Sequence, residues 1–141
     1  MLSQKITLFL TRISIGWLFF YAGITRILDP SWSAAEYIAQ AQTFPGFYAW
    51  LASPAVIGLV NFLNEWGLTL IGLALIVGIF VRWVSWTGML MMLLYYFPIF
   101  SFPYAGDHSY LVDEHVIYIL VLTLLIVFDA GKQWGFDGLR R

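Results

Sequence analysis

Glu65 is the residue whose type and position point most clearly to chemistry, because its carboxyl group lies inside an otherwise apolar run, residues 54–81. A charged side chain in the middle of a membrane-spanning helix costs about 2.5 to 3.5 kcal/mol, and such residues usually have a function. Arg26 and His115 lie near the ends of two other apolar runs. A carboxyl group, a guanidinium and an imidazole can together carry protons and stabilise an anion. We therefore expect Glu65 and His115 to be catalytic and Arg26 to contact a ligand.

Five further polar side chains occur at similar depths along the apolar runs, and we expect them to line the same pocket: Asn61, Asn64, Tyr96, Glu114 and Tyr118. Simpler roles exist for each type. The two amides can hydrogen-bond between helices, and the tyrosines can be packing or interface aromatics. Glu114, with Asp113 beside it, can complement the positive end of a helix that begins there. The sequence leaves both kinds of role open.

Arg12 and Asp129 form a second polar level, at the opposite end of the apolar runs. Arg12 either extends along the helix surface toward the headgroups or pairs with Asp129. We assign Arg12, Asp113 and Asp129 structural roles.

Metal and haem centres are poorly supported by the residue spacing. Asp113, Glu114 and His115 are consecutive and would point about 100° apart on a helix. The sequence has no Glu-x-x-His or His-x-x-x-His pair, its two histidines lie close together in the chain, and it has no cysteine. We therefore expect no metal, haem or iron–sulfur cluster. The net charge of -1 also gives no basic surface for nucleic acid.

The elements that must position these residues are long and apolar. Hydrophobic residues make up 61% of the chain and charged residues 11%, which is far from the composition of a soluble protein. Four runs approach the roughly 20 residues that cross a bilayer as a helix: residues 6–28, 54–81, 83–102 and 111–129. The sequence predicts an all-α membrane protein with one domain, a four-transmembrane-helix bundle.

The connection at residues 30–53, called the interfacial segment below, is long enough to have structure of its own. Residues 34–39 predict a short helix, and residues 44–50 predict a turn between aromatic anchors. We expect this segment to cover one end of the bundle.

The basic residues indicate the orientation in the membrane. Lys5, Arg12 and Arg82 lie at one end of the predicted helices, as does the tail at residues 130–141 with Lys132, Arg140 and Arg141. Because cytoplasmic loops carry the excess of Lys and Arg, both termini should be cytoplasmic.

Five blocks of the sequence together resemble the DoxX/DoxD-like proteins: residues 12–16, 21–30, 64–68, 71–75 and 112–118. The resemblance extends over nearly the whole chain in order. It implies a four-helix protein of the prokaryotic cytoplasmic membrane, similar to the DoxD subunit of thiosulfate:quinone oxidoreductase.

The function that follows is a quinone-linked oxidoreductase subunit. Glu65 would carry protons, His115 and Tyr118 would hydrogen-bond a quinone carbonyl, and Arg26 would stabilise an anion. Electrons would come from a bound substrate or a soluble redox partner. Two alternatives stay open: a non-catalytic membrane anchor or assembly subunit for such a partner, and a carrier for a small solute or lipid. The glycines also permit a homodimer without deciding for it.

Overall fold

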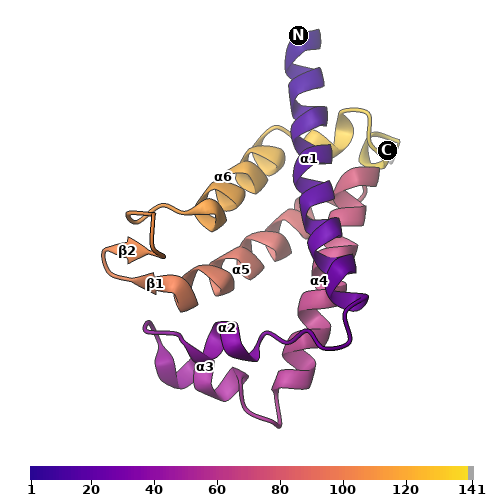
Figure 1. Ribbon diagram of the computed structural model, residues 1–141. Coiled ribbons are helices and arrows are strands. Elements are labelled where there is room, and N and C mark those ends of the chain that lie inside the picture. The colour runs from indigo at the N-terminus through magenta and orange to yellow at the C-terminus, as the bar shows by residue number, and fades with distance from the viewer. Residues whose placement is uncertain (140–141) are drawn as a thin grey trace.

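The computed structural model describes residues 1–139, and these residues are predominantly helical (Figure 1). Its long helices are α1 (Leu2–Ile27), α4 (Ile57–Val77), α5 (Val81–Ile99) and α6 (Glu114–Val127). Shorter elements are α2 (Ala35–Ala39), α3 (Pro45–Leu51), the hairpin of β1 (Phe100–Ser101) and β2 (Tyr104–Ala105), and the 3-10 turns η1 (Ala130–Lys132) and η2 (Phe136–Gly138). Arg140 and Arg141 lie outside the described residues.

The helix boundaries follow from local chemistry. Gly78 ends α4 in a left-handed conformation with φ 78°, which a residue without Cβ adopts at no steric cost, and its N–H donates to the Ala74 carbonyl. Asp113 begins α6, and its carboxylate accepts hydrogen bonds from the backbone N–H groups of His115 and Val116. The end of α4 and the start of α6 are therefore each determined by the residue at that position.

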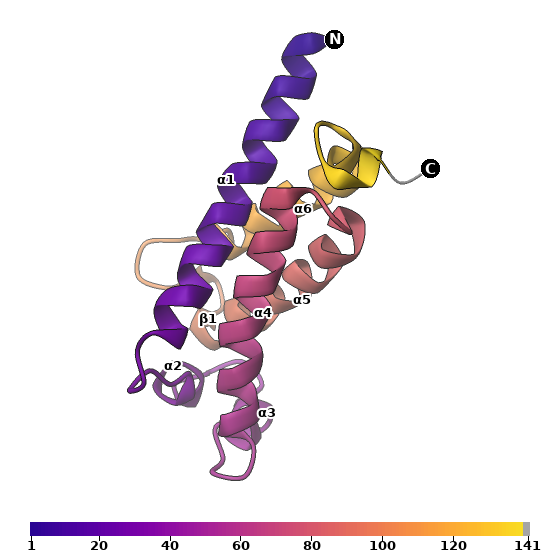
Figure 2. The same ribbon diagram turned by 90° about the vertical axis from the view of Figure 1, so that its right-hand side faces the viewer.

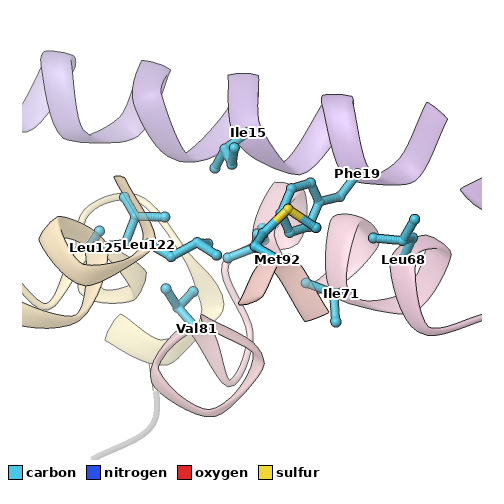
Figure 3. Close-up of a cluster of buried hydrophobic side chains, with 10 residues drawn as sticks. Ile15, Phe19, Leu68, Ile71, Val81, Met92, Leu122 and Leu125 are labelled. Carbon is cyan, nitrogen blue, oxygen red and sulfur yellow. The ribbon is translucent and has the colours of Figure 1, made fainter. Parts of the chain in front are cut away.

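The long helices pack as two pairs, α1 with α4 and α5 with α6, and the second pair slants away from the first (Figures 1 and 2). Successive long helices run in opposite directions, so the start of α1 and the tail lie at the same end of the molecule (Figure 1). The pairs meet in one apolar core that includes Phe19 of α1, Ile71 of α4, Met92 of α5 and Leu122 of α6 (Figure 3).

Length and composition favour membrane insertion for two of these helices. α1 and α4 are each long and apolar enough to cross a bilayer. α5 has 19 residues, and the apolar helix α6 has 14, fewer than the roughly 20 that span 30 Å of hydrocarbon at right angles. Compared with the expected bounds, all four long helices differ by two to four residues at one or both ends. A fourfold crossing of the membrane stays a prediction.

Glycines allow α1 and α4 to approach closely. A Cβ atom on Gly72 would lie 2.2 Å from the Phe20 backbone nitrogen and 2.6 Å from the Gly16 carbonyl oxygen. A Cβ on Gly23 would lie 2.3 Å from Thr69 Oγ1. Backbone atoms cannot move aside singly, so any larger residue at Gly72 must separate the helices.

Replacing Gly72 with alanine should therefore destabilise the fold by about 1 to 3 kcal/mol, the usual range for overpacking. Thermal unfolding of the purified variant in detergent would measure the loss. Gly58→Ala is the matched control, because Gly58 lies on the same helix and a Cβ there meets nothing within 4 Å. Equal stability of the two variants would mean that the helices separate without cost.

The interfacial segment contains two short helices where the sequence predicted one helix and a turn. Pro45 occupies the first turn of α3, where its fixed φ favours a helix, so the expected turn at residues 44–50 is helical instead. Side chains of the segment donate hydrogen bonds to α5: the Tyr37 hydroxyl to the Tyr95 carbonyl at 2.5 Å, and the Tyr48 hydroxyl to the Leu94 carbonyl at 2.9 Å. The segment covers the end of the bundle opposite the termini (Figure 1).

Burial raises the pKa of Tyr48 to about 12 from an ordinary value of 10.0. The pKa of Tyr37 is also raised, mainly by burial and to a lesser extent by the negative charge of Asp113. A phenol whose pKa is raised by folding stabilises the fold fully below its unfolded pKa, and this contribution is lost as the pH rises.

The interfacial segment should accordingly loosen between about pH 10 and pH 12. Hydrogen exchange of residues 34–52, followed as a function of pH, would detect the change. Tyr48→Phe removes one titrating group and should reduce the effect. A transition that this variant leaves unaltered would assign the pH dependence to other groups.

Arg12 holds the tail against α1. Its side chain is fully buried, and its guanidinium donates to the carbonyl oxygens of Ala130 at 2.7 Å, Gln133 at 3.1 Å and Trp134 at 3.3 Å. Asp129, the partner considered from the sequence, instead pairs with Lys132 at 2.9 Å on the surface. Arg12 therefore neither extends to the surface nor pairs with Asp129, because the carbonyls of a tightly turned tail already offer it three acceptors.

Asp137 completes this connection and was not anticipated from the sequence. Its carboxylate accepts the backbone N–H groups of Phe80 at 2.8 Å and Val81 at 2.9 Å, at the start of α5. Its own N–H donates to the Gly78 carbonyl at 2.9 Å. The tail thus joins α1 to the turn between α4 and α5.

Candidate functional site

Arg26, in the last turn of α1, faces two aromatic rings. Its guanidinium carbon lies 4.6 Å from the centre of the Trp32 ring and 5.7 Å from that of Tyr95. Nη1 donates a hydrogen bond to the Tyr95 hydroxyl at 3.1 Å. Arginine over aromatic faces is stabilised by the ring quadrupole, more strongly where water is displaced. The Arg26 side chain is therefore held against α5 and the interfacial segment.

Tyr95 connects the helices at this point. Its hydroxyl donates to the Asn64 side-chain oxygen, and the Asn64 amide donates to the Val60 carbonyl at 2.8 Å. Arg26 donates to the same hydroxyl, so α1, α4 and α5 are joined by a chain of three polar side chains. This chain fixes the orientation of the Tyr95 ring.

Asp113 and His115 form a buried pair at the start of α6. His115 Nδ1 lies 2.5 Å from Asp113 Oδ2, and the two side chains are only 12% and 5% exposed. The other Asp113 oxygen accepts the N–H groups of His115 and Val116. Because an ionised carboxylate can only accept, Nδ1 carries the proton and Nε2 is left to accept or release one.

The His115 ring lies edge-on between two tyrosines. Its centre is 5.9 Å from that of Tyr95 and 6.5 Å from that of Tyr118. The Asp113–His115 pair and the Arg26–Tyr95–Asn64 chain therefore meet at the Tyr95 ring, and we call these five residues with Tyr118 the Tyr95 cluster. An acid–imidazole pair, a cation and phenols placed together can accept protons and hydrogen-bond a carbonyl.

Glu65 follows Asn64 of this cluster, and its backbone lies where α4 packs against α1. A Cβ on Gly23 would lie 2.8 Å from its backbone oxygen, and that oxygen accepts a hydrogen bond from Thr69 Oγ1 at 2.6 Å. Its side chain is half-buried. Among residues 1–139 the carboxylate has no hydrogen-bond or ion-pair partner, and so no contact with Arg26 or His115 within 4.0 Å.

The remaining candidate residues lie outside the Tyr95 cluster. Asn61 accepts the N–H of Ala34 at 2.9 Å and bonds the Ser33 hydroxyl, which attaches the interfacial segment to α4. The Tyr96 hydroxyl donates to the Leu111 carbonyl, and its ring stacks on Phe100 at 5.1 Å. Glu114 is exposed in the first turn of α6. In the described part of the chain, no group of three or more His, Asp or Glu is arranged to hold a metal ion.

Tyr95 was missed from the sequence because Tyr96 was selected as the inward-facing tyrosine. Both follow the buried positions Gly88 and Met92 at helical spacing, at i+3 and i+4 from Met92. The hydroxyl partners decide between them: Tyr95 faces Arg26 and Asn64, whereas Tyr96 faces the hairpin side. The available signal was that Arg26 and Asn64 lie at the same depth on neighbouring helices, so that a tyrosine facing them gains two polar partners.

Helices that are apolar enough to enter a bilayer, with charged and amide groups gathered between them, define an α-helical membrane protein. The sequence pattern of the DoxX family matches residues 7–100, and the chain belongs to this family. The matched range contains Arg26, Asn64, Glu65 and Tyr95, and it ends before α6 with Asp113 and His115. No functionally curated protein and no solved structure matches the chain.

Proposed function

We propose that this protein is a quinone-linked membrane oxidoreductase subunit, with the Tyr95 cluster as its ligand site. The observation that supports this function best is the Asp113–His115 pair, buried beside a tyrosine whose hydroxyl is bonded to Arg26. Quinone reduction consumes two electrons and two protons, so a site within the bilayer needs a group that takes up protons repeatedly. A histidine whose Nδ1 is held by a carboxylate can take up and release a proton at Nε2.

The available donors fit a quinone. Nε2 of His115 and the hydroxyl of Tyr118 have no hydrogen-bond partner among the described residues. The hydroxyl can donate to a carbonyl oxygen directly, and Nε2 can do so once the ring carries a second proton, which it can then pass on. Arg26 is the cation for an anionic reduced form or for an incoming oxyanion such as thiosulfate, the donor that the family resemblance implies. The electrons come from such a donor or from a partner subunit, since a chain without cysteine offers no thiolate for an iron–sulfur cluster.

Binding of quinone is the direct test. The protein extracted from its native membrane in detergent should contain a co-purifying quinone, identified by mass spectrometry of the organic extract. Tyr118→Phe removes one free hydroxyl and should lower the retained amount, and Tyr104→Phe, on the exposed hairpin, is the control. Wild-type protein without quinone, and without a change in its spectrum on quinone addition, would refute the proposed function.

Glu65 is assigned in this proposal to proton delivery, because its half-buried carboxylate has no partner among the described residues and it follows Asn64 of the Tyr95 cluster. Glu65→Gln keeps the size of the side chain and removes its acid function, so it should abolish donor-dependent quinone reduction. Turnover by purified protein in proteoliposomes is the measurement, and unfolding temperature checks the fold. Unchanged turnover in the folded variant would exclude Glu65 from the mechanism and leave the Asp113–His115 pair as the proton-transfer group.

A membrane anchor or assembly subunit is the second candidate function. It is favoured by the fact that Arg26, Asn61 and Asn64 all bond groups of this chain, as structural residues do. Under this function, Glu65→Gln would lower stability or the retention of a partner protein, with no loss of a bound quinone.

The orientation proposed here places both termini in the cytoplasm, with four crossings of a prokaryotic inner membrane. It is supported by the start of α1 and the described part of the tail, which lie at one end (Figure 1), and by the basic residues of these elements: Lys5 near the start of α1, Arg82 at the start of α5 and Lys132 in η1. Labelling of single cysteines, introduced in this cysteine-free chain at residues 3 and 107, would test it.

A further inference from the structure

A cavity of about 300 Å³ opens at the end of the bundle where the termini lie. It is bounded by the start of α5, the end of α6 and η1 of the tail, and we call it the terminal cavity. Its volume is at the lower end of the range for small-molecule sites. The Tyr95 cluster contributes no residue to its wall, so the two sites are separate.

The wall of the terminal cavity is amphipathic. Ile126 contributes apolar surface over the buried side chains of Val81 and Leu125, and Trp83 lies at the side of the cavity, largely exposed. Exposed tryptophan is enriched at the level of the lipid headgroups, which suits the end of a membrane-spanning bundle. A ligand here can therefore reach both hydrocarbon and the polar interface.

The charged part of the wall contains two cations and two carboxylates: Arg82, Lys132, Asp129 and Asp137. Asp137 is already occupied by the N–H groups of Phe80 and Val81. Arg82 has no hydrogen-bond or ion-pair partner among residues 1–139. The structure thus offers one free guanidinium beside the Lys132–Asp129 ion pair.

That ion pair can exchange partners at small cost. Its atoms are 2.9 Å apart, but the two side chains are 62% and 56% exposed. Ion pairs exposed to this degree contribute only about 0 to 1 kcal/mol. A ligand with its own anion and cation could therefore replace each half of the pair by a charge-assisted hydrogen bond.

We propose that the terminal cavity binds the headgroup of a phosphoethanolamine phospholipid. The phosphate lies between Arg82 and Lys132, the primary ammonium donates to Asp129, and the acyl chains continue along Ile126 and Trp83. A choline headgroup has a phosphate but no N–H to donate to Asp129, and a glycerol headgroup has no cation. The paired charges of the wall therefore select phosphoethanolamine over both.

The test is native mass spectrometry of the full chain in detergent, with ethanolamine, choline and glycerol phospholipids of identical acyl chains. One ethanolamine lipid should be retained about tenfold more than either of the others, a difference of about 1.4 kcal/mol. Soluble phosphoethanolamine, as competitor, separates recognition of the headgroup from recognition of the chains. It should displace the lipid at high concentration if the headgroup is recognised.

Variants locate the site. Asp129→Asn should abolish the preference for ethanolamine over choline, and Arg82→Gln should weaken all three phospholipids. The matched controls are Asp107→Asn, on the loop after β2, and Lys5→Gln, on the exposed start of α1. Equal retention of the three lipids by the wild type would overturn the proposal. Loss of the preference in the controls, or its survival in Asp129→Asn, would do the same.

Discussion

Arg12→Met should lower the free energy of unfolding by about 3 kcal/mol or more, the largest stability effect that the structure predicts. The substitution removes the guanidinium donor from the carbonyls of Ala130, Gln133 and Trp134, of which only Ala130 keeps another donor, the N–H of Gln133. Each unsatisfied group that is buried costs about 1 to 3 kcal/mol. Removing the buried guanidinium recovers part of this cost, because its own desolvation is also lost. Thermal unfolding in detergent should shift down by about 10 °C.

Release of the tail gives this prediction a second readout. Limited trypsin digestion should cut after Lys132 faster in Arg12→Met than in the wild type, since the tail loses its attachment to α1. Lys5→Met removes an exposed cation from the same helix and is the control. Wild-type stability and an unchanged rate of cleavage in Arg12→Met would show that Asp137 alone holds the tail.

His115→Asn should reduce donor-dependent quinone turnover by about 10² to 10⁴, the usual contribution of a positioned acid–base group. Asparagine can still bond Asp113, but it cannot take up a proton near neutral pH. His108→Asn is the matched control, because His108 lies on the loop between β2 and α6, outside the Tyr95 cluster. Turnover and the affinity for quinone should be measured separately on the folded proteins.

The pH dependence of turnover distinguishes a proton-transfer role from a structural one. Asp113→Asn keeps a hydrogen-bond acceptor for Nδ1 but removes its charge, so a role in proton transfer should alter the pH profile of turnover, whereas a structural role should leave it unaltered. A variant His115→Asn with wild-type turnover and profile would remove the Asp113–His115 pair from the mechanism.

The sequence predicted the helical class and the membrane character of α1 and α4, because both depend on long runs of apolar residues that can be seen directly in the sequence. It also placed Arg26, Asn64 and His115 in one region, since their depths follow from the rise along each helix. It did not predict Tyr95, because a rotation of about 100° separates it from Tyr96 and only the neighbouring helices decide which one faces inward.

The hydrogen bonds between Arg12 and the tail could not be predicted either, for a different reason. Arg12 bonds backbone carbonyls, which every residue has, so nothing in the sequence distinguishes residues 130–134 as its partners. The carboxylate of Asp129 was the more obvious candidate and is used by Lys132. The interfacial segment differs, because Pro45 in the first turn of α3 was a local signal for a helix at residues 44–50, whereas the packing of Tyr48 against α5 could not be predicted from the sequence.

The attachment of Arg12 to the tail has a consequence for the order of biosynthesis. Arg12 is translated 118 residues before Ala130, whose carbonyl accepts a hydrogen bond from its guanidinium. Until residues 130–134 are made, the charge of Arg12 must therefore be accommodated by water, lipid phosphates or the insertion machinery. Burial of this cation is thus completed only after all the long helices have been translated.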